Sequence, residues 1–122
     1  MNNEEFRRHG HAVVDWIADY LENIEARRPV PAVQPGDILN QLAAEAPEQG
    51  EPMERILSDF DRIIVPGLAH WQHPGWFAFF ASNASPPSLL GEMLAAGVAV
   101  NCMSWATSPA ATELEQRSLE WL

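Results

Sequence analysis

Residues 86–100 predict a helix that is apolar on nearly every side, with Glu92 as its only charged residue. Ser85 is a suitable N-cap for this helix, and Pro86 and Pro87 fit its first turn. A helix that is apolar all round has to be buried all round. The rest of this 122-residue chain offers little surface to cover it. We therefore expect the chain to expose apolar surface that it cannot bury by itself.

Further helices are predicted where apolar side chains recur every three or four residues. Their predicted ranges are 3–28, 38–42, 52–65 and 109–122, with Asn2 or Asn3, Asp37, Pro52 and Ser108 at their starts. Between them, residues 29–36 are rich in proline and should form a stiff, extended arm. Residues 43–51 read as an exposed acidic loop. The predicted fold class of the chain is all-α.

The composition excludes several classes of function. The net charge is −10, and nucleic-acid binding needs clustered cations that such a chain lacks. No apolar run approaches the roughly 18 residues that a membrane-spanning helix requires. The single cysteine, Cys102, suits a reducing compartment, so we expect a cytoplasmic protein. All seven basic residues are arginine, which excludes any mechanism that uses a lysine amine of this chain.

The stretch 70–85 has neither helical periodicity nor strand alternation, yet it contains two tryptophans and three phenylalanines. Small and polar residues follow the aromatic ones, from Ala81 to Ser85. Aromatic walls that lead into small polar groups are typical of a small-molecule pocket. A loop that packs its rings beneath neighbouring helices explains the same residues equally well.

No strong metal or catalytic motif accompanies this stretch. His70, His73 and Cys102 could supply zinc ligands in principle, but their spacing matches no established zinc pattern. His9 and His11 are two residues apart on a helix and point in different directions. We expect no catalytic, cofactor-binding or metal-binding residue in the chain. Residue chemistry alone thus supports an assembly module at least as well as an enzyme.

Three stretches together resemble the group II pyridoxal-phosphate-dependent amino-acid decarboxylases, and most of all the aromatic-L-amino-acid (dopa, tyrosine, tryptophan) decarboxylases. The resemblance runs over essentially the whole chain, in the family's order. The matching stretches begin with Glu5-Phe6-Arg7-Arg8-His9-Gly10, with Val65-Pro66-Gly67-Leu68-Ala69-His70-Trp71-Gln72-His73-Pro74, and with Ser104-Trp105-Ala106-Thr107-Ser108-Pro109-Ala110.

The resemblance implies that this chain is the N-terminal segment of a longer, α/β enzyme of fold type I. Residues 1–85 would be a helical flap that lies across the second subunit of a homodimer. Residues 86–122 would begin the large cofactor-binding domain and end within it. The family's Schiff-base lysine comes later in the sequence. The full-length parent would bind pyridoxal phosphate and release carbon dioxide from aromatic L-amino acids, and this chain alone would be inactive.

The resemblance also implies the positions of a substrate pocket. One group of residues would line the pocket for the substrate and its aromatic side chain: Trp71, Phe79, Phe80, Ala81 and Ser82. Asn101 and Met103 would reach it from the partner subunit. Family members usually have tyrosine at the position of Phe79, so this chain lacks one hydroxyl group there. The alternative function is a stand-alone helical dimerisation module without catalysis.

Overall fold

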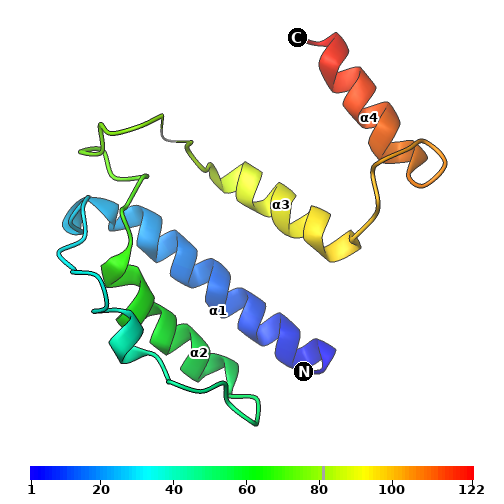
Figure 1. Cartoon of the computed structure of the whole chain (residues 1–122). Helices are drawn as coiled ribbons and strands as arrows, with labels where there is room; N and C mark the ends of the chain where they lie inside the picture. The colour runs from blue at the N-terminus through cyan, green and yellow to red at the C-terminus, as the bar shows by residue number, and fades with distance from the viewer. Residues whose placement is uncertain (81) are drawn as a thin grey trace. The chain divides into compact units, whose positions relative to one another are not determined.

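The computed structural model describes residues 1–80 and 82–122, and all regular elements within these ranges are helical (Figure 1). The predicted all-α class is thereby confirmed. The α-helices are α1 (Asn3–Glu22), α2 (Met53–Asp59), α3 (Pro86–Val98) and α4 (Pro109–Glu120). Short helical segments are η1 (Ile24–Ala26), η2 (Leu39–Gln41), η3 (Phe60–Ile64) and η4 (Val65–Gly67). None of the helices described is long and apolar enough to cross a bilayer. The chain forms two compact units, Met1–Asn83 and Ala84–Leu122.

Helix α1 begins where its sequence predicts, because Asn2 forms a capping box with Glu5. The Asn2 side chain accepts hydrogen bonds from the backbone N–H groups of Glu4 and Glu5, at 3.0 and 2.9 Å. In return, the backbone N–H of Asn2 donates to the Glu5 carboxylate at 2.8 Å and lowers the pKa of that carboxyl. Three of the free polar groups at the helix end are satisfied in this way.

The end of α1 differs from the prediction, since the helix stops at Glu22 rather than continuing to Arg28. Both the backbone N–H and the side-chain amide of Asn23 donate to the carbonyl of Asp19, at 3.0 and 2.8 Å. An asparagine that bonds the backbone locally offers the chain an alternative to a further helical turn. The chain continues as η1, in which Ile24 is buried.

Helix α1 runs parallel to the helical segment that comprises α2, η3 and η4 (Figure 1). Near its start, Arg8 donates a hydrogen bond to Glu54 at 3.2 Å. Two turns further on, the indole N–H of Trp16 donates to Asp61 at 3.2 Å. The residue numbers rise together in both partners, so the two segments have the same direction. Parallel neighbours need a long return connection, and residues 27–52 provide it.

The helix predicted for residues 52–65 is interrupted rather than regular. It is α-helical only in α2, then widens into the π-helical η3 and tightens into η4. Its apolar stripe supplies the core of the first unit, because Ile63 and Val65 are buried and Val65 is 0% exposed. Gly67 lies against the side chain of Ile38, so the segment that follows the arm is packed closely onto the end of this helical segment.

The predicted N-cap role of Asp37 is wrong. Its carboxylate accepts the backbone N–H of Gln34 at 2.7 Å, and its own N–H donates to the carbonyl of Gln34 at 3.0 Å. The residues between them are Pro35 and Gly36, and Gly36 has a φ of 99°. A proline followed by a glycine with positive φ is typical of a type II turn. Asp37 therefore closes this turn instead of capping η2.

In the second unit, α3 starts as predicted. Ser85 accepts the backbone N–H of Ser88 at 3.4 Å, and the Ser88 hydroxyl accepts the N–H of Ser85 at 3.0 Å. The helix ends at Ala99, which has a left-handed φ of 48°. No residue of α3 is buried, although most of its side chains are apolar. The predicted excess of apolar surface is thus present in this unit.

Helix α4 begins at Pro109, as predicted, but the side chain of Ser108 makes no capping hydrogen bond. The backbone carbonyl of Ser108 instead accepts the hydroxyl of Thr112 at 3.1 Å, and Ser108 is buried. The preceding link is connected to the helix by the indole N–H of Trp105, which donates to Glu113 at 3.0 Å. The boundary of the helix was therefore predictable, whereas its capping bonds were not.

Candidate functional site

The candidate site is the aromatic loop that follows η4, residues 70–80. Successive turns fold its first half: the N–H of His73 donates to the carbonyl of His70, and the N–H of Trp76 donates to the carbonyl of His73, both at 2.9 Å. The ring of His73 accepts the N–H of Gly75 at 2.8 Å. Pro74 and Gly75 break any regular structure here. The backbone is therefore compact enough to bring distant aromatic rings of the loop together.

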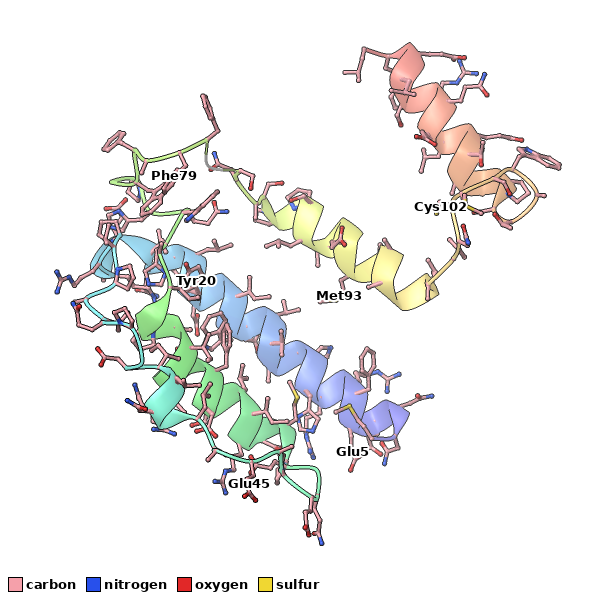
Figure 2. All side chains as sticks on the ribbon, in the orientation of Figure 1. Glu5, Tyr20, Glu45, Phe79, Met93 and Cys102 are labelled. Atoms are coloured by element: carbon pink, nitrogen blue, oxygen red, sulfur yellow. The ribbon has the colours of Figure 1, made fainter. Side chains whose placement is uncertain are left out.

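Three of these rings, Trp71, Trp76 and Phe79, form a triangular cluster, called the stack below, in which Trp71 is nearly parallel to the other two. Trp71 lies 6.0 Å from Trp76 and 6.2 Å from Phe79, with interplanar angles of 20° and 17°. The centroids of Trp76 and Phe79 are 6.2 Å apart. Trp71 is 41% exposed and Phe79, which Figure 2 labels, is 81% exposed, so the stack is partly open to solvent. Aromatic groups pack at these distances with a gain beyond burial alone, and the open side can accept another flat ring.

Phe79 holds its place in the stack with an unusual backbone. Its φ is 59°, in the left-handed region that side chains other than glycine seldom adopt. Such a conformation costs on the order of 1 kcal/mol and persists where surrounding contacts determine it. Here the contacts are those with Trp71 and Trp76. The structure thus brings two predicted site residues, Trp71 and Phe79, into direct contact.

The other predicted residues of this loop are not joined to the stack. Phe80 is fully exposed, as is most of Phe77 beside it. Ser82 is exposed as well. Ala81 lies outside the described residues. The roles assigned to these positions stay predictions.

Asn101 and Met103 belong to the second unit, in the link between α3 and α4. The side-chain carbonyl of Asn101 accepts the backbone N–H of Met103 at 2.8 Å, which forms a local turn. Met103 is largely exposed. Their predicted contribution to a pocket from the partner subunit stays a prediction.

Sequence reasoning missed the most buried polar residue next to the loop, His70. The residue is 5% exposed, and its Nδ1 lies 2.8 Å from the hydroxyl of Tyr20. Tyr20 is labelled on α1 in Figure 2. Its backbone N–H donates to the carbonyl of Pro29 at 3.0 Å. The sequence suggested only a weak zinc role for His70. A helical tyrosine fifty positions away carries no local signal of this contact.

The electrostatics of the pair are set by burial and by Arg27. Burial lowers the pKa of His70, and the nearby charges of Arg27 and His73 lower it further. Burial raises the pKa of Tyr20, while Arg27, 5.1 Å from its ring, acts in the opposite direction. Both shifts favour neutral groups. In the histidine tautomer that carries its proton on Nε2, the hydroxyl of Tyr20 donates to Nδ1 of His70.

A separate shallow pocket of about 370 Å³ opens beside His70. Its lining residues are Arg27, Arg28, Pro31, Ala32, Val33, Pro66 and His70. The members of the aromatic stack do not line it. Within residues 1–80 and 82–122, no group of three histidine, cysteine or acidic side chains could hold a metal ion.

The chain does not by itself fit pyridoxal phosphate as a covalent cofactor. The cofactor's aldehyde needs a lysine amine, and the 122 residues include none. What the first unit does offer is a partly open aromatic surface. Such a surface can bind and orient a flat side chain, but it contains no group that transfers a proton or forms a covalent bond.

Comparisons with known proteins identify the family of this chain. The model of the pyridoxal-dependent decarboxylase conserved domain matches residues 35–122. Histidine decarboxylase of Drosophila melanogaster is 50% identical over 124 residues, which cover 100% of this chain and 14% of the relative. Phenylacetaldehyde synthase of Petunia hybrida is 49% identical over 122 residues, covering 100% of this chain and 24% of that protein.

A solved structure gives the same result for the fold. The crystal structure of Catharanthus roseus tryptophan decarboxylase in complex with L-tryptophan matches with a TM-score of 0.93 and 38% identity. The match covers 99% of this chain and 26% of that one. This chain therefore spans about a quarter or less of the length of these proteins. The family match confirms the resemblance predicted from the sequence: the chain belongs to the family of pyridoxal-dependent decarboxylases.

Proposed function

We propose that this chain is the N-terminal part of a pyridoxal-phosphate-dependent decarboxylase that converts aromatic L-amino acids to amines and carbon dioxide. The observation that carries the proposal is the half-open stack of Trp71, Trp76 and Phe79 in a chain of this family. A flat aromatic side chain can extend such a stack on its exposed side. The similar tryptophan decarboxylase, solved with L-tryptophan, supports an aromatic substrate.

The role proposed for the chain is to hold the substrate's side chain and to contribute to a homodimer. Residues 1–85 serve as the flap that contacts the second subunit, and residues 86–122 begin the large domain. Exposed apolar side chains on both units support this role, among them Phe6 on α1 and Leu94 on α3. In the dimer, Asn101 and Met103 of one subunit complete the pocket of the other.

The cofactor belongs to the parent protein rather than to these residues. Bound pyridoxal phosphate supplies an electron sink for the bond that breaks. The residues of this chain bind the aromatic side chain and keep water from it. We propose a cytoplasmic location, in line with the single exposed cysteine.

A second candidate function, the formation of an aldehyde instead of an amine, is supported by the similarity to phenylacetaldehyde synthase, whose name states an aldehyde product. The same aromatic surface could serve an enzyme of that kind. From a different class, a stand-alone helical dimerisation module would share the helices without any chemistry. Product analysis separates the first two, and cofactor binding separates both from the third.

The test uses the reading frame extended beyond Leu122. The extended protein is mixed with pyridoxal phosphate, freed of excess and examined by visible absorbance. The 122-residue chain, which lacks lysine, is the control. A retained absorbance band in the extended protein alone, with amine and carbon dioxide formed from aromatic L-amino acids, supports the proposal. No band in either protein would leave the dimerisation module.

A pair of variants tests the stack itself. Phe79→Ala removes a ring that stacks on Trp71, whereas Phe77→Ala removes a neighbouring ring that is 91% exposed. Phe79→Ala should raise KM for aromatic substrates several-fold while kcat changes less, because the lost contact acts on binding. Equal kinetics for the two variants would contradict the assignment of the stack to the substrate.

A further inference from the structure

The aromatic loop starts at a residue that is tied to two other segments of the first unit. His70 bonds to Tyr20 of α1 through its ring and to Pro29 of the arm through its backbone N–H. Its carbonyl accepts the N–H of His73, which begins the turn within the loop. The ring, the backbone N–H and the carbonyl of His70 therefore all take part in hydrogen bonds. It is also the last buried residue before the exposed part of the loop.

Tyr20, the partner of His70, is itself held firmly. Its ring stacks on Trp16 with a centroid distance of 5.3 Å, and the guanidinium of Arg27 lies over it. Trp16 is in turn fixed by its bond to Asp61 and by an edge contact with Phe60 at 5.2 Å. The hydroxyl of Tyr20 thus has a defined position, set by contacts between α1 and η3.

Trp71 is the next residue after His70, and the stack begins with it. The peptide unit between them is planar, so the orientation of His70 limits where the ring of Trp71 can lie. At the other end of the loop, the exposed side chains of Phe79 and Phe80 offer much weaker anchoring. The loop is held mainly from its beginning.

We propose that His70 is a positioning residue: held by the hydroxyl of Tyr20, it places Trp71 so that the ring stacks on Trp76 and Phe79. The inference rests on the proposed function only for what the stack binds, since the stack itself is a feature of the structure. His70 touches no reacting atom. It acts through Trp71, on the binding of the substrate's side chain.

The charged and titratable groups around His70 agree with this role. Arg27 follows α1, His73 belongs to the loop, and Asp61 of η3 lies 4.0 Å from the guanidinium of Arg27. Arg27 and His73 both oppose a positive charge on His70. A neutral histidine with Nδ1 as acceptor is the form that the tyrosine hydroxyl can hold.

Three substitutions test the proposal in the full-length protein. Tyr20→Phe removes the donor, and His70→Phe removes the acceptor at similar size. His70→Asn retains an oxygen acceptor near the position of Nδ1 and should rescue the effect. His11→Phe, at an exposed position of α1, is the matched control.

The first readout is circular dichroism, because stacked indoles give an exciton couplet. The contribution of the Trp71–Trp76 pair is obtained by subtracting, for each protein, the spectrum recorded with the additional substitution Trp76→Phe. We expect this difference couplet in the wild type, in His70→Asn and in His11→Phe. We expect its loss in Tyr20→Phe and in His70→Phe. The second readout is a several-fold increase in KM with little change in kcat for the two variants that lose the couplet.

The outcomes are distinct. A full couplet in His70→Phe, or its loss in His70→Asn to the same extent as in His70→Phe, would overturn the positioning role. Additive losses in the Tyr20→Phe/His70→Phe double variant would also overturn it, since residues that act through one bond are not additive. If the couplet follows the predicted pattern but aromatic substrates bind equally well throughout, the proposed function fails and the positioning role stands.

Discussion

The two units of this chain treat their apolar side chains differently. In the first, Met1–Asn83, the side chains of Ile24, Ile63 and Val65 are buried. In the second, Ala84–Leu122, α3 is the most apolar helix of the chain, yet none of its residues is buried. In α3 a capping box and proline entry mark the start of the helix, whereas its apolar surface is left without a partner within this unit. Periodicity predicts a helix in both units, but only the first contains its own partner surface.

The largest expected effect comes from placing a charge at equivalent apolar positions of the two units. Val65→Asp puts a carboxylate at a fully buried site and should destabilise the first unit by more than about 4 kcal/mol, since an unpaired charge there cannot be solvated. Leu94→Asp, at a site that is 70% exposed, should change stability by less than about 0.5 kcal/mol. The loss of stability in the Val65→Asp variant is measured by urea unfolding, with the indole fluorescence of Trp16 as the signal.

The stability of the Leu94→Asp variant is measured in the same way, with the indole fluorescence of Trp105 in the second unit as the signal. Equal losses of stability in the two variants would contradict the difference between the units.

Replacing a glycine by alanine should lower the stability of the first unit at Gly67 and raise that of the second unit at Gly91. At Gly67 an added Cβ would lie 2.8 Å from Cδ1 of Ile38, so Gly67→Ala should cost on the order of 1 kcal/mol because the end of the Ile38 side chain has to move. At Gly91 in α3 nothing lies within 4 Å, and alanine favours helix by about 0.5–1 kcal/mol. Thermal unfolding by circular dichroism compares them. Stabilisation by both changes would show that Ile38 is not packed against Gly67 as described.

The pH dependence of stability should report on the Tyr20–His70 pair in the first unit. Folding lowers the pKa of His70 below 6.5, so the unfolded state binds a proton that the folded state resists. Stability is therefore complete above pH 6.5 and falls as the pH drops through the lowered pKa of folded His70. Folding raises the pKa of Tyr20 above 10.0, so stability also falls as the pH rises past that value.

Denaturant titrations between pH 4 and 11 measure both losses. His70→Asn should abolish the acidic loss and leave the alkaline one. An acidic loss of unchanged size in that variant would assign it to other groups.

The smallest difference between the two units concerns the caps of their helices, which are alike. Asn2→Ala and Ser85→Ala each remove one half of a capping box and should cost about 1 kcal/mol of helix stability. Because capping is local, the two losses should be similar despite the difference in burial. Helicity measured by circular dichroism against temperature tests this. A much larger loss for Asn2→Ala would mean that the start of α1 also depends on its packing against α2.

Local signals accounted for most of the predictable structure. The starts of α1, α3 and α4 were predicted because caps and proline positions act within a few residues. The end of α1 at Asn23 was missed, since the pattern of apolar residues continued past it. The π-helical η3 was missed as well. So was the turn that Asp37 closes, although Pro35-Gly36 is a local signal for it.

The candidate site was predictable to a similar degree. The aromatic loop was visible as a run of rings without periodicity, and the resemblance to the decarboxylases selected Trp71 and Phe79 within it. The stacking of Trp76 with them required the turns around His73. The division of the chain at residue 85 stays a prediction, as do the substrate-binding assignments of all seven positions: Trp71, Phe79, Phe80, Ala81, Ser82, Asn101 and Met103.

The sequence by itself determined the helical class, the helix starts and the family, and its lack of lysine excluded covalent binding of an aldehyde cofactor by this chain. These properties depend on composition or on residues close together in the chain. Only the tertiary structure decided that α1 runs parallel to α2 and that Tyr20 holds His70, fifty residues away. Such contacts depend on the path of the connecting arm, and no local pattern of side chains specifies that path.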